Sequence, residues 1–103
     1  MRLFLTGIPA SAGIAEGAAK IFLPGRDAAD FLEGEILVTT ITDPTMVGAM
    51  IKAAGIVTDI GGITSHPAIL SREMGIPCVV NTREATTKIK DGMRLRIDGG
   101  KGE

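Results

Sequence analysis

The chain has 103 residues, of which 11 are Lys or Arg and 12 are Asp or Glu, so its formal net charge is −1. A nearly neutral chain is not drawn electrostatically to nucleic acid or to an anionic membrane surface. No apolar run approaches the roughly 18 residues of a membrane span. One histidine and one cysteine exclude a disulfide framework and argue against a metal cluster. The composition therefore predicts no nucleic-acid partner, no membrane partner and no bound metal.

The length and the overall composition predict one globular domain over residues 1–103. Apolar residues make up 45% of the chain and charged residues 22%, which is typical of a soluble protein. The apolar run at the N-terminus is too short for a signal peptide, so we expect a cytoplasmic protein.

The first third of the chain is rich in glycine and alanine and carries no obvious chemistry. Residues 18–23 read as a strand that Pro24 and Gly25 end. We expect small β elements here, at the edge of a sheet.

A more regular pattern begins with the β-branched run 36–40, a predicted buried strand. Asp43 and Pro44 then suit the N-cap and the first position of a helix. Apolar residues recur at helical spacing over 46–54, and Gly55 is expected to stop this helix.

Two further strands and a helix follow. Residues 56–58 and 78–80 read as strands, and residues 67–74 between them have helical spacing, with Gly75 as the expected C-cap. Alternating residues predict a half-buried strand over 93–98. Strand and helix alternating with short connections predict an α/β fold with a parallel βαβαβ unit, which we interpret as a plain doubly wound sheet.

Ligands of such sheets bind at the carboxyl ends of the strands, and the loop after residues 56–58 has a suitable composition. Gly61 and Gly62 allow backbone N–H groups to approach a ligand, and Thr64 and Ser65 add hydroxyl donors. His66, the only histidine, stands at the start of the next helix, where free N–H groups and the helix dipole favour a phosphate. The dipole also favours a neutral imidazole, which suits a nucleophile that accepts a phosphoryl group.

Less specific interpretations remain open for the same residues. A lone histidine near a helix start is more often a cap or a surface residue than a catalyst. Ser65 beside His66 is not a catalytic triad, because neighbouring side chains point apart and no orienting Asp is identified. Arg72 has no assigned role, and Cys78 reads as a small core residue.

The run GGITSHPAILSREMGIP over residues 61–77 resembles the signature of the phosphohistidine, or swivelling, domain of phosphoenolpyruvate-utilising enzymes. Residues 7–13, 36–57 and 90–99 are also similar to that family, so the resemblance covers nearly the whole chain. The family includes phosphoenolpyruvate synthase, pyruvate phosphate dikinase and enzyme I of the sugar phosphotransferase system. The resemblance implies a compact β/β/α swivelling-domain fold, with an extra β layer beyond the doubly wound sheet.

The resemblance also implies a function. The residue matching His66 is transiently phosphorylated and carries the phosphoryl group between an ATP-grasp nucleotide-binding partner and a barrel that binds phosphoenolpyruvate or pyruvate. This chain would then be a phosphotransferase component with Gly61, Gly62, Thr64 and Ser65 around the phosphate. The domain itself would bind no cofactor, and the partners would bind Mg and ATP or phosphoenolpyruvate. Thr64 matches a regulatory phosphorylation site of some family members.

The sequence departs from the family at three positions. Pro67 stands where alanine is usual and removes one backbone N–H at the helix start. Ser71 and Asn81 replace the commoner alanine and glycine. The chain has no nucleotide-binding motif of its own, so the alternative function is a non-catalytic regulatory or interaction module that keeps the swivelling-domain fold.

Overall fold

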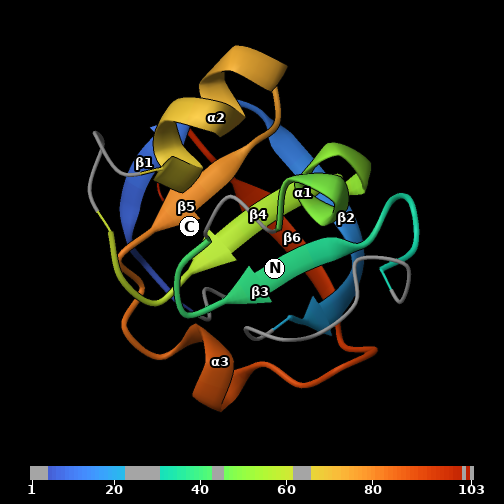
Figure 1. Ribbon diagram of the computed structural model, residues 1–103. Helices are drawn as coiled ribbons and strands as arrows, with labels where there is room; N and C mark the ends of the chain where they lie inside the picture. Colours follow the sequence, from blue (N-terminus) through green and yellow to red (C-terminus); the bar gives the residue numbers. More distant parts are fainter. Residues whose placement is uncertain (1–4, 23–30, 43–45, 62–65, 101, 103) are drawn as a thin grey trace.

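The computed structural model describes residues 5–22, 31–42, 46–61, 66–100 and 102, and it contains strands and helices in alternation (Figure 1). In chain order the elements are β1 (Ile8–Ser11), β2 (Ile14–Ile21), β3 (Ile36–Thr39), α1 (Val47–Lys52), β4 (Gly55–Thr58), α2 (His66–Met74), β5 (Cys78–Val80), α3 (Ala85–Lys88) and β6 (Arg94–Asp98).

The six strands form one sheet in the order β1-β5-β4-β3-β2-β6. Strands β3, β4 and β5 run parallel, with Thr39 beside Thr58 and Val57 beside Val79. Every residue of these three strands is buried, as expected for strands that are covered on both faces. The predicted parallel βαβαβ unit is confirmed as β3-α1-β4-α2-β5.

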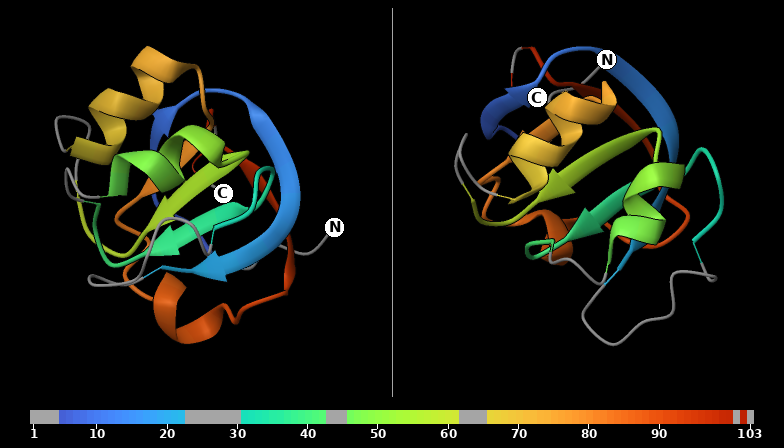
Figure 2. Two further views of the ribbon diagram at one scale, coloured as in Figure 1. Left: turned by 45° about the vertical axis from the view of Figure 1, so that its right-hand side comes forward. Right: turned by 45° about the horizontal axis from the view of Figure 1, so that its top comes forward.

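The expectation of a plain doubly wound sheet was wrong, because the sheet curls. Strand β2 pairs parallel with β3 and antiparallel with β6, and β1 pairs antiparallel with β5. Figure 2 shows how β2 bends around the molecule, and Figure 1 shows β6 passing behind β3 and β4. The N–H of Gly99, just after β6, donates to the carbonyl of Gly13 at 2.8 Å, which extends the pairing of β6 with β2. A Cβ atom at Gly99 would strike the carbonyl oxygen of Ser11 in β1, so the two edge strands of the sheet approach each other. The antiparallel strands supply the extra β layer of a β/β/α swivelling domain.

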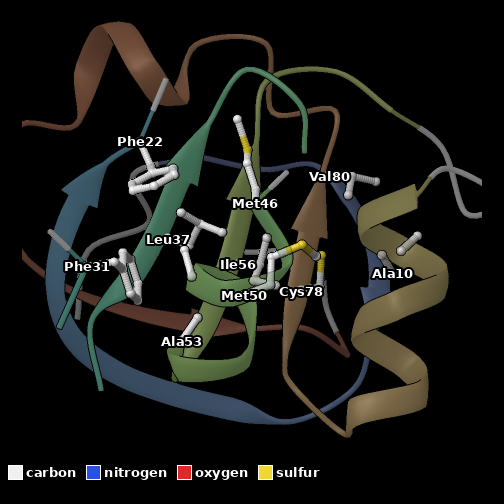
Figure 3. Close-up of a cluster of buried hydrophobic side chains, with 12 residues drawn as sticks. Ala10, Phe22, Phe31, Leu37, Met46, Met50, Ala53, Ile56, Cys78 and Val80 are labelled. Atoms are coloured by element: carbon white, nitrogen blue, oxygen red, sulfur yellow. The ribbon is translucent and has the colours of Figure 1, made fainter. Parts of the chain in front are cut away.

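The curled sheet separates two hydrophobic clusters. The first lies between the parallel strands and helices α1 and α2, and Figure 3 shows its side chains converging. The rings of Phe22 and Phe31 meet edge to face there, with centroids 6.1 Å apart. The second cluster lies on the opposite face of the sheet, against α3 and β6. Its buried residues are Ala19, Ile36, Val38, Val57, Ala85, Ile89 and Ile97.

Several predicted boundaries need correction. The strand expected over 18–23 is β2, Ile14–Ile21, and α1 begins at Val47 and ends at Lys52. Asp43 and Pro44 lie outside the described residues. Gly55 does not stop the helix but is the first residue of β4. A Cβ atom at Gly55 would lie 2.3 Å from Cδ1 of Ile97, so this glycine is required by the close approach of β6.

The main chain near the two ends of the molecule is joined. The N–H of Gly7 donates to the carbonyl of Gly102 at 2.8 Å. Among the helices that the structure describes, none has the length and apolar character to cross a membrane.

Candidate functional site

The carboxyl ends of β3, β4 and β5 meet at one edge of the sheet, and the loop that follows β4 begins there. Of the predicted site residues, Gly61 and the backbone of His66 are described. Gly62, Thr64 and Ser65 lie outside the described residues, and Thr64 is also the residue with the predicted regulatory role. The geometry of the site is therefore given by the root of the loop and by the helix that follows it.

Thr58 ends β4 and turns the chain into this loop. Its hydroxyl donates to the carbonyl of Ile60 at 2.8 Å, and its own carbonyl accepts from the N–H and the hydroxyl of Thr82, at 3.1 and 2.9 Å. Thr82 follows β5, so the ends of two neighbouring strands are bound together at this point.

Asp59 is the next residue, and it is 8% exposed. Its carboxylate accepts hydrogen bonds from the N–H of Thr86, at 2.9 Å, and from the Thr86 hydroxyl. Its N–H donates to the carbonyl of Thr39 at 3.1 Å, and its carbonyl accepts from the N–H of Arg83 at 2.8 Å. Sequence reasoning assigned no role to Asp59, because its partner Thr86 is 27 positions away.

The segment after β5 adopts an uncommon backbone that makes these contacts. Asn81 and Arg83 have φ angles of 58° and 71°, in the left-handed region that favours glycine. Asparagine is one of the few other residues that adopt this region readily, which explains how Asn81 can stand where the family commonly has glycine.

Gly61 has a φ of 125°, a conformation that is strained for any residue with a side chain. The glycine predicted to allow close backbone approach is thus also needed to turn the chain. His66 is the first residue of α2. This helix therefore begins shortly after the carboxyl end of β4, as the sequence predicted, and its first N–H groups lack intrahelical acceptors.

Helix α2 is held against the sheet through small residues. Ala68 and Ser71 are fully buried, whereas Ile69 and Arg72 are exposed. The helix ends at Met74, and Gly75 follows as the predicted cap with a φ of 71°, while the N–H of Ile76 donates to the carbonyl of Ser71 at 2.9 Å. This pattern is a Schellman C-cap, so the C-terminal end of the helix that begins with His66 is fixed.

Cys78 is fully buried in β5, beneath α2. Burial raises the pKa of its thiol from 9.0 to about 11, although the neighbouring Ser71 side chain and the charge of Arg72 act in the opposite direction. The thiol is thus protonated at neutral pH, and its interpretation as a core residue is confirmed. Among the described residues, no three His, Cys, Asp or Glu side chains are grouped so that they could hold a metal ion.

Comparisons with known proteins connect this fold with a family. The sequence pattern of the family described as "PEP-utilising enzyme, mobile domain" matches residues 31–102. The chain is 52% identical over 101 residues to a probable phosphoenolpyruvate synthase of Archaeoglobus fulgidus, covering 98% of this chain and 13% of that protein. It is 53% identical over 100 residues to the phosphoenolpyruvate synthase of Pyrococcus furiosus, covering 97% of this chain and 12% of that protein.

A protein with a different name also matches, the rifampicin phosphotransferase of Streptomyces sviceus. The identity is 44% over 98 residues, covering 95% of this chain and 11% of that protein. Among solved structures, the solution structure of an Enzyme I protein superimposes with a TM-score of 0.64 and 32% identity, over 75% of this chain and 32% of that one. The Thermococcus kodakaraensis aconitase X superimposes with a TM-score of 0.63 and 24% identity, over 95% of this chain and 93% of that one, and this likeness concerns the fold alone.

The curled sheet with two helices on one face is thus a compact β/β/α swivelling-domain fold. The match over residues 31–102 shows that the chain belongs to the family of phosphoenolpyruvate-utilising enzyme mobile domains. The chain spans about an eighth of the length of the phosphoenolpyruvate synthases that it matches.

Proposed function

We propose that this chain is a phosphotransfer component that carries a phosphoryl group on His66. The observation that supports the proposal most strongly is that the only histidine of the chain is the first residue of α2, directly after the glycine-containing loop at the carboxyl end of β4. The first N–H groups of a helix and its dipole stabilise a phosphate, and a neutral imidazole is a competent nucleophile.

In the proposed reaction the imidazole attacks the phosphorus of the donor in line with the leaving oxygen. A P–N bond forms as the P–O bond breaks. With phosphoenolpyruvate as donor, the enolate of pyruvate leaves and takes up a proton. The second transfer reverses these roles, since an oxygen of the acceptor attacks and the imidazole leaves. The residues proposed to surround the phosphate are Gly61, Gly62, Thr64 and Ser65.

The proposal includes partners, because one carrier needs two sites to exchange with. We assign to one partner an ATP-grasp nucleotide-binding domain and to the other a domain that binds phosphoenolpyruvate or pyruvate, with Mg²⁺ and the small molecules held there. The relatives support the presence of partner domains, because the chain matches about an eighth of the length of phosphoenolpyruvate synthases and thus leaves room for further domains in them.

Transfer to His66 can be measured in a reconstituted assay. The partner is the Pyrococcus furiosus phosphoenolpyruvate synthase in which the histidine that matches His66 is replaced by alanine, and the donor is phosphoenolpyruvate. We expect the intact mass of this chain to rise by one phosphoryl group, in an adduct that is labile in acid and stable in base. The His66→Ala variant, with circular dichroism as the check of folding, should gain no mass. Equal phosphorylation of that variant would contradict the proposal, and so would an unmodified wild-type chain.

Pro67 supports the alternative of a regulatory or interaction module. It is the second residue of α2 and has no backbone N–H to offer a phosphate. The Pro67→Ala variant distinguishes the two functions. A phosphocarrier should be phosphorylated in both forms, whereas a module that has lost the chemistry would gain phosphorylation only with alanine.

A further inference from the structure

We propose that Asp59 is a positioning residue for phosphoryl transfer, because its bond to Thr86 fixes the root of the loop that leads to His66. This inference rests on the proposed function of His66. It adds a residue to which the sequence signature assigned no role, together with a partner from a distant part of the chain.

The bond between Asp59 and Thr86 uses both oxygens of a buried carboxylate. Oδ1 accepts from the N–H of Thr86 at 2.9 Å, and Oδ2 accepts from the Thr86 hydroxyl. Because Asp59 is only 8% exposed, water cannot readily replace these donors. The N–H of Thr86 belongs to the first turn of α3 and has no acceptor within that helix. Asp59 thus satisfies a donor that would otherwise be unpaired, and each partner holds the other in place.

The backbone at the loop root is held from both neighbouring strands. The N–H groups of Asp59 and Ile60 donate to the carbonyls of Thr39 and Thr40, each at 3.1 Å, on the side of β3. On the side of β5, the carbonyl of Asp59 accepts from the N–H of Arg83 at 2.8 Å. The carboxylate adds a third attachment, to α3. It is the attachment that a side-chain substitution can remove without altering the main-chain bonds.

The position of this root matters because the chain from Asp59 reaches His66 in seven residues. At the far end, α2 is fixed by the burial of Ala68 and Ser71 and by its C-cap. If Asp59 is released, the loop root with Gly61 loses its attachment to α3 and moves relative to His66, which α2 holds in place. Small displacements of phosphate-binding groups relative to the nucleophile are costly in rate, because in-line attack requires alignment.

The test uses the reconstituted assay with Asp59→Asn, Thr86→Val and Thr86→Ser. Thr86→Val removes the hydroxyl while keeping the shape of the side chain, and Thr86→Ser restores a donor. We expect the maximal rate of transfer to fall about tenfold in Asp59→Asn and Thr86→Val, with the KM for this chain unchanged. Thr86→Ser should stay within about twofold of the wild type, because it keeps the hydrogen bond.

Ile97→Val is the control for lost stability. Ile97 is buried in the second hydrophobic cluster, so its shortening lowers stability without altering the contacts of Asp59. A purely structural role for Asp59 predicts that variants of equal stability transfer at equal rates, and that result would overturn the inference. A wild-type rate in a folded Thr86→Val variant would also overturn it.

A second donor separates failure of this inference from failure of the proposed function. Phosphoramidate phosphorylates imidazoles without a protein partner, since its P–N bond breaks, ammonia leaves, and a P–N bond to the imidazole forms. If the wild-type chain accepts nothing from the partner, the proposed function fails. The role of Asp59 is then tested with phosphoramidate alone. The measured quantity is the rate of His66 phosphorylation in the folded chain divided by the rate in the urea-unfolded chain. The inference holds if that ratio changes about tenfold between the wild type and Thr86→Val, and fails if it does not.

Discussion

Gly55 at the start of β4 and Ile97 in β6 touch across the inside of the curled sheet. A Cβ atom at Gly55 would lie 2.3 Å from Cδ1 of Ile97 and 3.3 Å from Cδ1 of Ile36. Both isoleucines are buried in the second cluster and have little room to move. The spacing between β6 and the parallel strands is therefore set by the absence of a side chain at Gly55.

Gly55→Ala should lower the free energy of unfolding by about 1–3 kcal/mol, because the added methyl group overpacks the core. Ile97→Val removes the Cδ1 atom with which the added methyl group clashes. On its own this substitution should lower the free energy of unfolding by about 0.5–1.5 kcal/mol. The double variant should therefore be more stable than Gly55→Ala alone. Urea unfolding of the four proteins measures this coupling, and simple additivity of the two losses would contradict the contact.

Thr39 and Thr58 are neighbours in the register of β3 and β4, yet their hydroxyls differ in hydrogen bonding. The Thr58 hydroxyl donates to the carbonyl of Ile60, whereas within the described part of the chain the buried Thr39 hydroxyl has no partner. Thr39→Val should be neutral or stabilise the fold by up to about 1 kcal/mol, and Thr58→Val should destabilise it by about 1 kcal/mol. Urea midpoints of the two variants give the comparison, and the reverse order would count against these assignments.

The stability of the protein should depend on the protonation of Cys78 at high pH. The pKa of the thiol is about 11 in the folded protein, because of burial, against 9.0 ordinarily. Between these values the unfolded chain has lost the proton that the folded chain keeps. The free energy of unfolding should therefore be unaffected by Cys78 below pH 9 and fall by up to ~3 kcal/mol as the pH rises towards 11.

Cys78→Ala is the control for this pH dependence. The variant should be less stable at neutral pH because it leaves a small cavity, but its decline above pH 9 should be shallower than that of the wild type. Urea unfolding at intervals of pH gives both curves. Parallel curves would show that other groups cause the decline.

Gly61→Ala tests the turn that leads to the proposed phosphate site. With a φ of 125° at this position, a side chain should cost about 1–3 kcal/mol and displace the following residues. We expect transfer to His66 to fall about tenfold in the reconstituted assay. Gly92→Ala is the matched control, because Gly92 also has a positive φ, of 85°, with no atom near its Cβ position. Equal transfer by the two variants would mean that the Gly61 turn does not position His66.

The sequence predicted the parts of the fold that depend on neighbouring residues. The apolar runs at 36–40, 56–58 and 78–80 match β3, β4 and β5, and Gly75 caps α2 because a left-handed residue must follow the helix. The start of α2 near His66 was also predictable from neighbouring residues, because a glycine-containing loop precedes it in the sequence. The strand order then places this loop at one edge of the sheet.

Features that depend on distant residues could not be predicted in this way. Gly55 reads locally as a helix stop, and only the approach of Ile97, 42 positions later, explains it as a strand residue. The bond between Asp59 and Thr86 likewise joins residues 27 positions apart. Helix α3, Ala85–Lys88, is too short to produce a periodic pattern. The local sequence pattern does not predict these features, because the curl of the sheet brings the contacting residues together from distant parts of the chain.

The hydrogen bond between Gly7 and Gly102 has a consequence for rearranging the chain. The backbone nitrogen of Gly7 lies 2.8 Å from the carbonyl oxygen of Gly102. A short linker between these two residues would therefore close the polypeptide into a ring without disturbing the sheet. New ends could then be opened at the exposed turn of Asp91 and Gly92, far along the chain from the loop before His66. Such a circular permutant would keep every strand pairing and present the same face of α2.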